Sequence, residues 1–291
     1  MNSQSPLVSV LMSCYNSEEY IDEAILSILN QTYQKFEFII INDGSEDKTL
    51  EKIKAYNDER ISIINHHNMG IVPSLNDGLK SCKGKYIARM DADDISSLDR
   101  IEKLMSFLEQ NPDISACGGT IEEFNENGSI KTTKRPLSHI DLVFYSLHRA
   151  PISNPSSMIR ATVFTENGLK YDPIYKYGQD VKLWSEIIKI GKLANLPDQL
   201  LQYRRSDNQV STSKRQEQKQ LAQTVRADTY QYIRNHPELL AIASTIHLKD
   251  YFKYMVRHDS SMLSNKKIKE ICTSKLSFID KTKLSLYSLV K

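Results

Sequence analysis

The 291-residue sequence lacks the features that mark membrane-spanning, secreted and disulfide-rich proteins. No stretch approaches the roughly 18 to 20 consecutive apolar residues that a membrane-spanning helix needs. Residues 1–6 contain no basic segment leading into an apolar one, as a signal peptide would. The four cysteines, at positions 14, 82, 117 and 272, form no C-x-x-C pair and have no histidine at zinc-finger spacing. We therefore expect a cytoplasmic protein with reduced thiols, without a disulfide framework or a structural zinc site.

The chain also has little net charge, but that charge is unevenly distributed. It carries 38 Lys and Arg against 36 Asp and Glu in total. Residues 1–203 hold 21 basic and 28 acidic side chains, a balance of −7, whereas residues 204–291 hold 17 and 8, a balance of +9. Because the acidic body would repel phosphate, the distribution disfavours nucleic acid as a partner.

The basic end of the chain has a helical pattern. Residues 216–235 contain neither Gly nor Pro, and Pro237 suits the first position of a further helix. From residue 249 onward, basic side chains alternate with aromatic and aliphatic ones. Such a region can lie against an anionic membrane, where each basic residue contributes about 1 kcal/mol, or it can be an ordinary solvated helical face. The pattern leaves a peripheral membrane contact and its absence equally open.

Short β-branched runs alternate with amphipathic stretches through the first half of the chain. This alternation predicts a doubly wound, mostly parallel α/β sheet with helices on both faces. Such sheets bind ligands at the carboxyl ends of their strands, where the strand order reverses. The predicted strands are residues 8–12, 36–41, 61–65, 86–90 and 114–117, and the predicted helices are residues 18–29, 48–56, 72–81 and 98–109.

Polar segments follow four of these strands, at residues 13–16, 42–45, 66–70 and 91–94. No G-x-G-x-x-G follows the first strand, and no G-x-x-x-x-G-K-[ST] occurs in the chain. The usual glycine-rich loops for dinucleotides and triphosphates are therefore missing, and a nucleotide bound at this edge needs its phosphates neutralised by other means.

Asp91 and Asp93, separated by one residue at a strand end, can supply those means. Two such carboxylates can share a Mg²⁺ or Mn²⁺ ion that completes its coordination with diphosphate oxygens. The alternative is an Asp-rich turn with no ligand. Asp94, the last of the group, is expected to cap the helix predicted to begin near Leu98.

Two residues after earlier strands are candidates for nucleotide binding. Asp43 can accept hydrogen bonds from a base or a ribose, or can simply form an Asx-turn. Tyr15 can stack on a base, although a tyrosine taken alone is more often a core residue. His66 and His67 have no metal-binding spacing, and we expect them to be surface or turn residues.

The second half of the chain is predicted to contain a helix at residues 136–149, a proline-rich break at 150–155, and strands at 156–159 and 199–203. Asp180 lies near the start of a helix that runs to about Lys189, where a carboxylate is stabilised as its anion. It is a candidate functional residue, or else a helix cap above a core filled by Trp184. Arg204 or Arg205 can contribute charge to a bound diphosphate, or can belong to a solvated linker.

Together these residues resemble the inverting glycosyltransferases of family 2, of bacterial cell-envelope or capsule type, which have the nucleotide-diphospho-sugar transferase (GT-A) fold. The resemblance covers about residues 6–213, and the order and spacing of its motifs are far more specific than any one motif. The matching segments are residues 8–16, Gln31-Thr32-Tyr33, Ile41-Asn42-Asp43-Gly44-Ser45, Asn68-Met69-Gly70, Asn76-Asp77-Gly78-Leu79, residues 84–94, Asn154-Pro155-Ser156, residues 179–184 and Tyr203-Arg204.

The resemblance implies a role for each matching residue. The nucleotide, usually uridine diphosphate, would be held by a set comprising Ser13, Tyr15, Asp43, Asn68, Asn76 and Arg204. Asp93 would contact the Mn²⁺ or Mg²⁺ cofactor directly, and Asp91 would face the metal and the sugar or ribose. Asp180 would be the catalytic base that deprotonates a hydroxyl of a glycan or lipid-linked acceptor. The implied function is the transfer of a sugar from a nucleotide-diphospho-sugar donor during polysaccharide synthesis.

The resemblance also implies how the chain is divided. Residues 1–213 would form the GT-A domain, with a nucleotide-binding half at about 6–120 and an acceptor half at about 121–213. Residues 214–291 would form a helical, basic C-terminal region. We expect the protein to be cytoplasmic, with an optional peripheral contact at the inner face of the cell membrane.

Two positions depart from the family pattern. Gln179 stands where a Glu usually precedes the base, and Ser206 stands where a His often follows the Tyr-Arg pair. These departures raise the alternative of a non-catalytic nucleotide-sugar-binding or scaffold protein of the same fold. A metal-dependent phosphotransfer site is a third alternative, but it leaves Asp180 without a role. The presence of Asp91, Asp93 and Asp180 together favours the enzyme.

Overall fold

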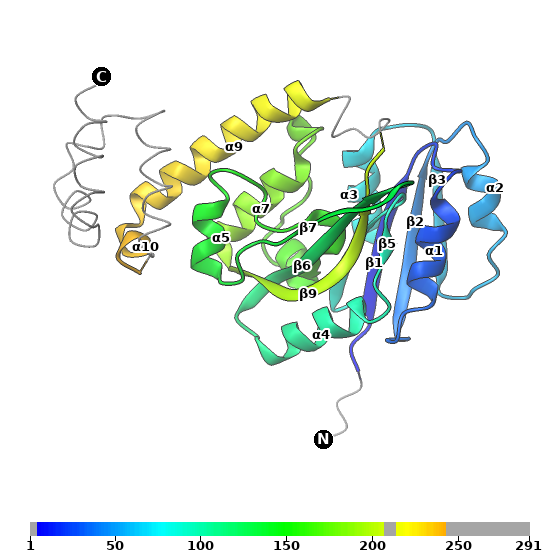
Figure 1. The fold of residues 1–291 in the computed structure, drawn as a ribbon, viewed down its shortest axis with the longest axis horizontal. Coiled ribbons are helices and arrows are strands. Elements are labelled where there is room, and N and C mark those ends of the chain that lie inside the picture. The colour runs from blue at the N-terminus through cyan, green and yellow to red at the C-terminus, as the bar shows by residue number, and fades with distance from the viewer. Residues whose placement is uncertain (1–4, 207–213, 243–291) are drawn as a thin grey trace.

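The computed structural model describes residues 5–206 and 214–242, and Figure 1 shows them as a central sheet flanked by helices. The basic residues from 249 onward, on which the predicted membrane contact depends, lie outside these ranges. In the part that the structure describes, no helix is both long and apolar enough to cross a membrane.

The sheet of the described chain has nine strands and is mixed, with a parallel first part. Its elements are β1 (Val8–Cys14), β2 (Phe36–Asp43), β3 (Ile61–His66), β4 (Tyr86–Asp91), β5 (Ile95–Ser96), β6 (Ile114–Asn125), β7 (Gly128–Thr133), β8 (Met158–Arg160) and β9 (Lys192–Arg204). The order is β3-β2-β1-β4-β8-β6-β9-β5, with β7 paired to β6. Strands β3, β2, β1 and β4 are parallel, β6 is parallel to β9, and β8 runs antiparallel between β4 and β6. The predicted doubly wound, mostly parallel sheet is therefore present.

Helices cover both faces of this sheet. They are α1 (Ile21–Leu29), α2 (Thr49–Lys54), α3 (Ile71–Ser81), α4 (Arg100–Gln110), α5 (His139–Tyr145), α6 (Ala161–Thr165), α7 (Gln179–Ile190), α9 (Arg215–Asn235) and α10 (Pro237–Ile242). Leu11 and Ile39 point into a core shared with α3 and α7. Val10 and Phe38 point the opposite way, into a core shared with α1 and α4. Burial on both faces is why β1 and β2 are almost continuously apolar in sequence.

Three predicted elements of the second half differ from the observed ones. The helix predicted at 136–149 is only α5, because the Ser138 side chain caps it by accepting a hydrogen bond from the Asp141 amide. The strand predicted at 156–159 begins later, at β8, since the Ser157 hydroxyl and amide both donate to the Asn154 carbonyl and hold a 3₁₀ turn there. The strand predicted at 199–203 is the end of the longer β9, which pairs with β6 through several register shifts.

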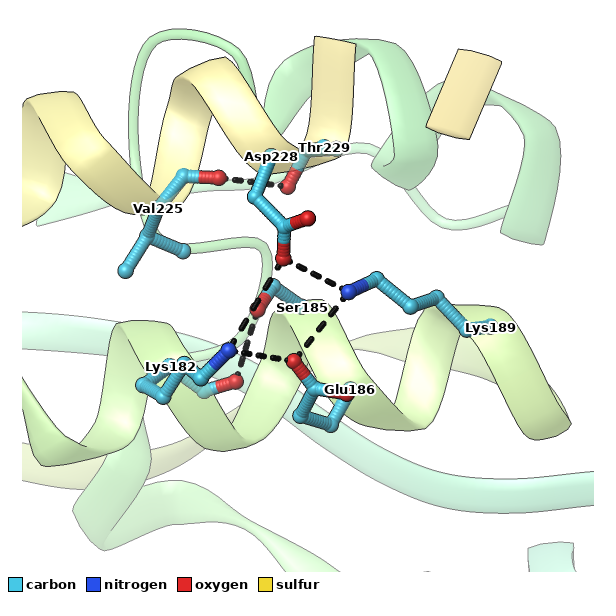
Figure 2. A network of polar contacts seen from close by, with 7 residues as sticks. All are labelled: Lys182, Ser185, Glu186, Lys189, Val225, Asp228 and Thr229. Carbon is cyan, nitrogen blue, oxygen red and sulfur yellow. Dashed lines mark hydrogen bonds and ion pairs between the residues drawn. The ribbon is translucent and has the colours of Figure 1, made fainter. Parts of the chain in front are cut away.

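Helix α9 begins the predicted C-terminal region and packs against α7. Tyr230, Ile233 and, beyond α9, Leu240 are buried in the same core as Trp184 of α7. Figure 2 shows the polar side of this contact: Lys189 of α7 binds Asp228 of α9, with 2.6 Å between Nζ and Oδ2. Lys182 and Glu186 complete the network. This helical region therefore packs directly on the helix that carries Asp180.

Candidate active site

The loops after β1 and β2 are tied together by side chains. Asn16 has a positive φ of 48°, a conformation that Asn tolerates better than most residues. Its Oδ1 accepts from the Glu46 amide at 2.9 Å, and its own amide donates to the Ser45 hydroxyl at 3.0 Å. Tyr15, next to it, is 46% exposed. The core alternative for Tyr15 is therefore wrong, and its ring is accessible at the sheet edge where a nucleotide was predicted.

Asp43 organises the loop that leads from β3 to α3. Its Oδ1 accepts from the Met69 amide at 2.8 Å and its Oδ2 from the Gly70 amide at 2.9 Å. The Asx-turn alternative is therefore wrong, because the buried Asp43 side chain binds a different segment of the chain. Oxygens that each accept one hydrogen bond still have a lone pair, so the predicted nucleotide contact stays compatible with this geometry.

The loop after β2 and the loop after β3 lie in close contact around Asp43. A Cβ at Gly44, where φ is +70°, would lie 2.4 Å from the Asn68 backbone nitrogen, so only glycine fits there. Asn68 itself is exposed beside the same edge. His66, expected to be a surface or turn residue, is the last residue of β3; its side chain is 14% exposed, and its Nδ1 lies 3.4 Å from Oδ1 of Asp43. His67 is exposed, as expected.

Asn76 contacts protein backbone with both ends of its side-chain amide. Its Nδ2 donates to the Tyr171 carbonyl and its Oδ1 accepts from the Tyr171 amide, both at 2.9 Å. These bonds join α3 to the segment that precedes α7. In this arrangement Asn76 positions the chain around Tyr171, and a nucleotide contact would require it to exchange those partners.

Asp91, at the end of β4, and the residues up to Asp94 form a segment called the acidic loop, which lies against the end of β1. Ser13 and Asp91 are direct neighbours in the parallel register of β1 and β4. Burial raises the pKa of Asp91 to about 6; the charge of Arg89 opposes this shift, whereas the charges of Asp93 and Asp180 increase it. The structure thus brings Asp180, from far along the chain, close to the two carboxylates of the predicted metal site.

Asp94 does not have its predicted role. Instead of capping α4, whose start has no side-chain cap, its Oδ1 accepts from the Arg204 amide at 2.9 Å. The reason is that β5 intervenes between Asp94 and α4 and pairs with β9, which turns this side chain toward the end of β9. Burial raises the pKa of Asp94 well above its usual range, and the charges of Asp93 and Asp91 add to the rise.

Arg204 supports the same loop with its side chain. Its Nε donates to the Asp93 carbonyl at 2.9 Å, and its Nη2 lies 2.8 Å from a carboxylate oxygen of Glu23. The guanidinium also lies over the rings of Tyr20 and Phe124, at 4.2 and 4.6 Å from their centroids. The linker alternative for Arg204 is therefore wrong, while contact with a diphosphate stays a prediction. The linker that was predicted beyond it reaches residues 207–211, outside the described ranges.

Two buried arginines beneath this loop were not singled out as site residues from the sequence. Nη2 of Arg89 lies 2.9 Å from Oδ1 of Asp91. Arg100 donates through Nη1 to the carbonyls of Arg89 and Pro155, at 2.8 and 2.7 Å. Burial lowers the pKa of Arg100 to about 10. The sequence signal that could have identified Arg89 is its position as a charged residue in the apolar interior of β4.

Asp180 occupies the second position of α7. Gly178, not Asp180, precedes the helix, and Trp184 is fully buried below it. Asp180 is therefore not the cap residue of this helix, whereas the predicted core around Trp184 is present. Burial raises the pKa of Asp180; the amides of Val181 and of Asp180 itself, and the charge of Arg135, partly offset the rise. A carboxylate held in this way has a strengthened affinity for a proton, as a general base needs.

The acidic loop has the chemistry of a shared metal site. Within the described ranges, no three His, Cys, Asp or Glu side chains are grouped closely enough to enclose a metal ion. Asp91 and Asp93 nevertheless offer oxygen ligands whose mutual repulsion a divalent cation would relieve, and Oδ2 of the neighbouring Asp94 is buried without a hydrogen-bond partner in that part of the chain. These residues fit a hard cation such as Mg²⁺ or Mn²⁺ that takes its other ligands from a diphosphate and water.

Comparisons with known sequences identify the family. The family model for glycosyl transferase family 2 matches residues 9–193. An uncharacterized glycosyltransferase from Haemophilus influenzae is 43% identical over 242 residues, covering 79% of this chain and 75% of the relative. The amylovoran biosynthesis glycosyltransferase AmsE from Erwinia amylovora is 29% identical over 211 residues, covering 70% of this chain and 79% of the relative.

Solved structures show the same fold at low sequence identity. TarS 1–349 from S. aureus in complex with UDP-GlcNAc has a TM-score of 0.61 and 16% identity, covering 96% of this chain and 79% of that one. The mannosyltransferase PcManGT from Pyrobaculum calidifontis, in complex with GDP-Man and Mn²⁺, has a TM-score of 0.56 and 13% identity, covering 99% and 88%. The family match and the sequence relatives establish that this chain is a glycosyltransferase and belongs to glycosyl transferase family 2.

Proposed function

We propose that this chain is a metal-dependent, inverting glycosyltransferase that moves a sugar of hexosyl or N-acetylhexosaminyl type from a UDP-sugar to an acceptor hydroxyl. The acceptor is a glycan or a lipid-linked glycan made for the cell surface. One observation carries the proposal: the charge of Asp180, from a helix remote in sequence, acts on the carboxyl of Asp91 together with that of Asp93. A base and a diphosphate-binding carboxylate pair at one place are what a single displacement requires.

The residues divide the reaction between them. Tyr15 and Asp43 lie at the ends of β1 and β2, where the base and ribose of the donor would bind. Asp91 and Asp93 would hold the cation, which when bound neutralises the charge that develops on the leaving diphosphate. Asp180 accepts the proton of the acceptor hydroxyl as that oxygen bonds to the anomeric carbon. The bond from this carbon to the diphosphate breaks with its electron pair on the diphosphate. Because the hydroxyl attacks from the face opposite the diphosphate, the anomeric centre inverts.

Three similar proteins support the finer parts of this proposal. TarS was solved with UDP-GlcNAc, which favours a uridine nucleotide, and PcManGT was solved with Mn²⁺, which favours a divalent cation. AmsE is named for amylovoran biosynthesis, which favours a polysaccharide product. A cytoplasmic location, with the basic C-terminal region at the inner face of the membrane, completes the proposal.

Calorimetric titration of UDP into the protein tests the donor site. We expect UDP to bind when Mn²⁺ or Mg²⁺ is present, and Asp93→Ala to lose that metal dependence. UDP-sugars that bind should then be hydrolysed slowly by the wild type and not by Asp180→Asn. If UDP does not bind with any divalent cation, the uridine assignment is wrong and GDP, CDP and dTDP must be compared.

A further inference from the structure

Arg135 has an unused hydrogen-bond donor in the part of the chain that the structure describes, and its charge acts on the proposed base, Asp180. It follows β7 and precedes α5, in the half of the chain expected to receive the acceptor. Its Nε donates to the Ala150 carbonyl at 3.0 Å, which fixes the guanidinium. Its Nη1 is buried and has no hydrogen-bond partner among the described residues. A buried donor left unpaired costs about 1 to 3 kcal/mol, so this nitrogen is poised to pair with a group that is not part of the protein.

The surroundings of Arg135 show what kind of group that would be. Burial lowers the pKa of Arg135, and the charge of Arg149 lowers it further. The charges of Tyr145, Asp180 and Glu123 act in the opposite direction and raise the pKa of Arg135. The bond to Ala150 places Arg135 against the residue that directly follows Arg149. Within the described ranges, neither arginine forms an ion pair. The charges of the two arginines oppose each other, and an anion that binds both would relieve that repulsion.

We propose that Arg135 and Arg149 form an anion-binding subsite for the acceptor, which therefore carries a carboxylate or a phosphate close to the hydroxyl that receives the sugar. This inference rests on the proposed function, because it takes Asp180 as the base that faces that hydroxyl. Arg135 is the specificity-determining residue, since its Nη1 is buried and its charge acts on Asp180. Arg149 is exposed and strengthens the local positive charge.

The test compares three acceptor probes that differ only at one carbon of the sugar. They are p-nitrophenyl β-glucoside, the corresponding glucuronide and the corresponding 6-phosphate. Saturation-transfer NMR on the full chain with UDP and Mg²⁺, chosen because Mn²⁺ is paramagnetic, measures the affinity for each probe. We expect at least one anionic probe to bind tenfold or more tightly than the glucoside, and the two anions to distinguish a uronic acid from a phosphate ester.

Variants assign any such preference to the two arginines. Arg135→Gln should abolish the tenfold preference for the anionic probe and leave affinity for the neutral glucoside within threefold. Arg135→Lys should retain part of it, and Arg149→Gln, at an exposed position that folding tolerates, should reduce it two- to fivefold. Lys80→Gln, which removes an equal charge on α3 from a side chain that is 76% exposed, is the control and should change nothing.

Several outcomes would overturn the inference. Equal affinity for all three probes would do so, as would a preference that survives in both Arg135→Gln and Arg149→Gln or falls equally in Lys80→Gln. A tenfold loss of UDP affinity in Arg135→Gln would assign this arginine to the donor instead. Failure of the proposed function has a separate signature, since it would appear as absent metal-dependent UDP binding in the wild type, whatever the probes do.

Discussion

The amide of Arg204 donates to Oδ1 of Asp94 across 110 residues of sequence, at 2.9 Å. This bond joins the end of β9 to the loop that carries Asp91 and Asp93. The Arg204 side chain also binds the Asp93 carbonyl. Arg204 therefore contacts the acidic loop at one side chain, that of Asp94, and at one backbone carbonyl, that of Asp93. The position of the proposed metal ligands therefore depends on a strand that follows them by more than a hundred residues.

Substitutions at Asp94 should separate its hydrogen bond from its charge. Asp94→Asn keeps an oxygen to accept from Arg204 and removes a buried charge, so we expect unchanged or higher stability. Asp94→Ala loses the bond and leaves the Arg204 amide unpaired, which should cost about 1 to 3 kcal/mol of unfolding free energy. Urea denaturation measures both. If Asp94→Asn proved as destabilising as Asp94→Ala, the charge itself would be what holds the loop.

Asp180→Asn should lower activity without lowering stability. Burial holds the pKa of Asp180 above its usual 3.8, so the native state binds this proton more tightly than the unfolded state does. Stability is then lost as pH rises through the window between the two pKa values, because the native protein must ionise a partly buried carboxyl. Removing the charge should leave the melting temperature at pH 7 equal or higher, while sugar transfer falls by about 10² to 10⁴-fold.

The pH profile gives a second readout of the same residue. In the wild type, kcat/KM should fall as pH drops through the raised pKa of Asp180, because the base becomes protonated. That acid limb should lie above the ordinary range of an aspartate and should be missing from any residual activity of Asp180→Asn. An unchanged acid limb in the variant would assign the titration to another group.

Asn76→Ala should distinguish a positioning role from a nucleotide contact. The substitution removes both bonds to the Tyr171 backbone, and we expect a loss of about 1 to 3 kcal/mol in unfolding free energy. If Asn76 acts only through this loop, UDP affinity measured by calorimetry stays within threefold of the wild type. A larger loss of UDP affinity, with stability unchanged, would instead support the contact with the nucleotide that the family resemblance implies.

Two substitutions should show what holds α9 on α7. Ile233 is fully buried, so Ile233→Ala should cost about 2 to 5 kcal/mol. Asp228, whose side chain is 45% exposed, binds Lys189 in a network that solvent screens, and Asp228→Asn should cost less than about 1 kcal/mol. Thermal melts of the two variants measure the difference. A larger effect from Asp228→Asn would mean that the ion pairs of Figure 2 dominate the contact.

Local sequence determined most of the first half of this protein. The apolar runs of β1, β2 and β4 are buried on both faces. The amphipathic stretches between them could only be the covering helices, so the sheet and its polar edge could be predicted from the sequence. Asp91 and Asp93 were found in the same way, because their position directly after a buried strand depends only on neighbouring residues. The family pattern added Asp180, whose local context alone also allowed a helix cap.

Tertiary structure decided what each of these side chains contacts. The local pattern around Asp94 is that of a helix cap, yet β5 pairs with β9 and redirects it to Arg204. His66 and Arg135 owe their surroundings to segments remote in sequence, Asp43 in the first case and Ala150 in the second. Hydrogen bonding and burial act between groups that are close in space, and the spacing of residues along a chain fixes that closeness only within a turn or a strand.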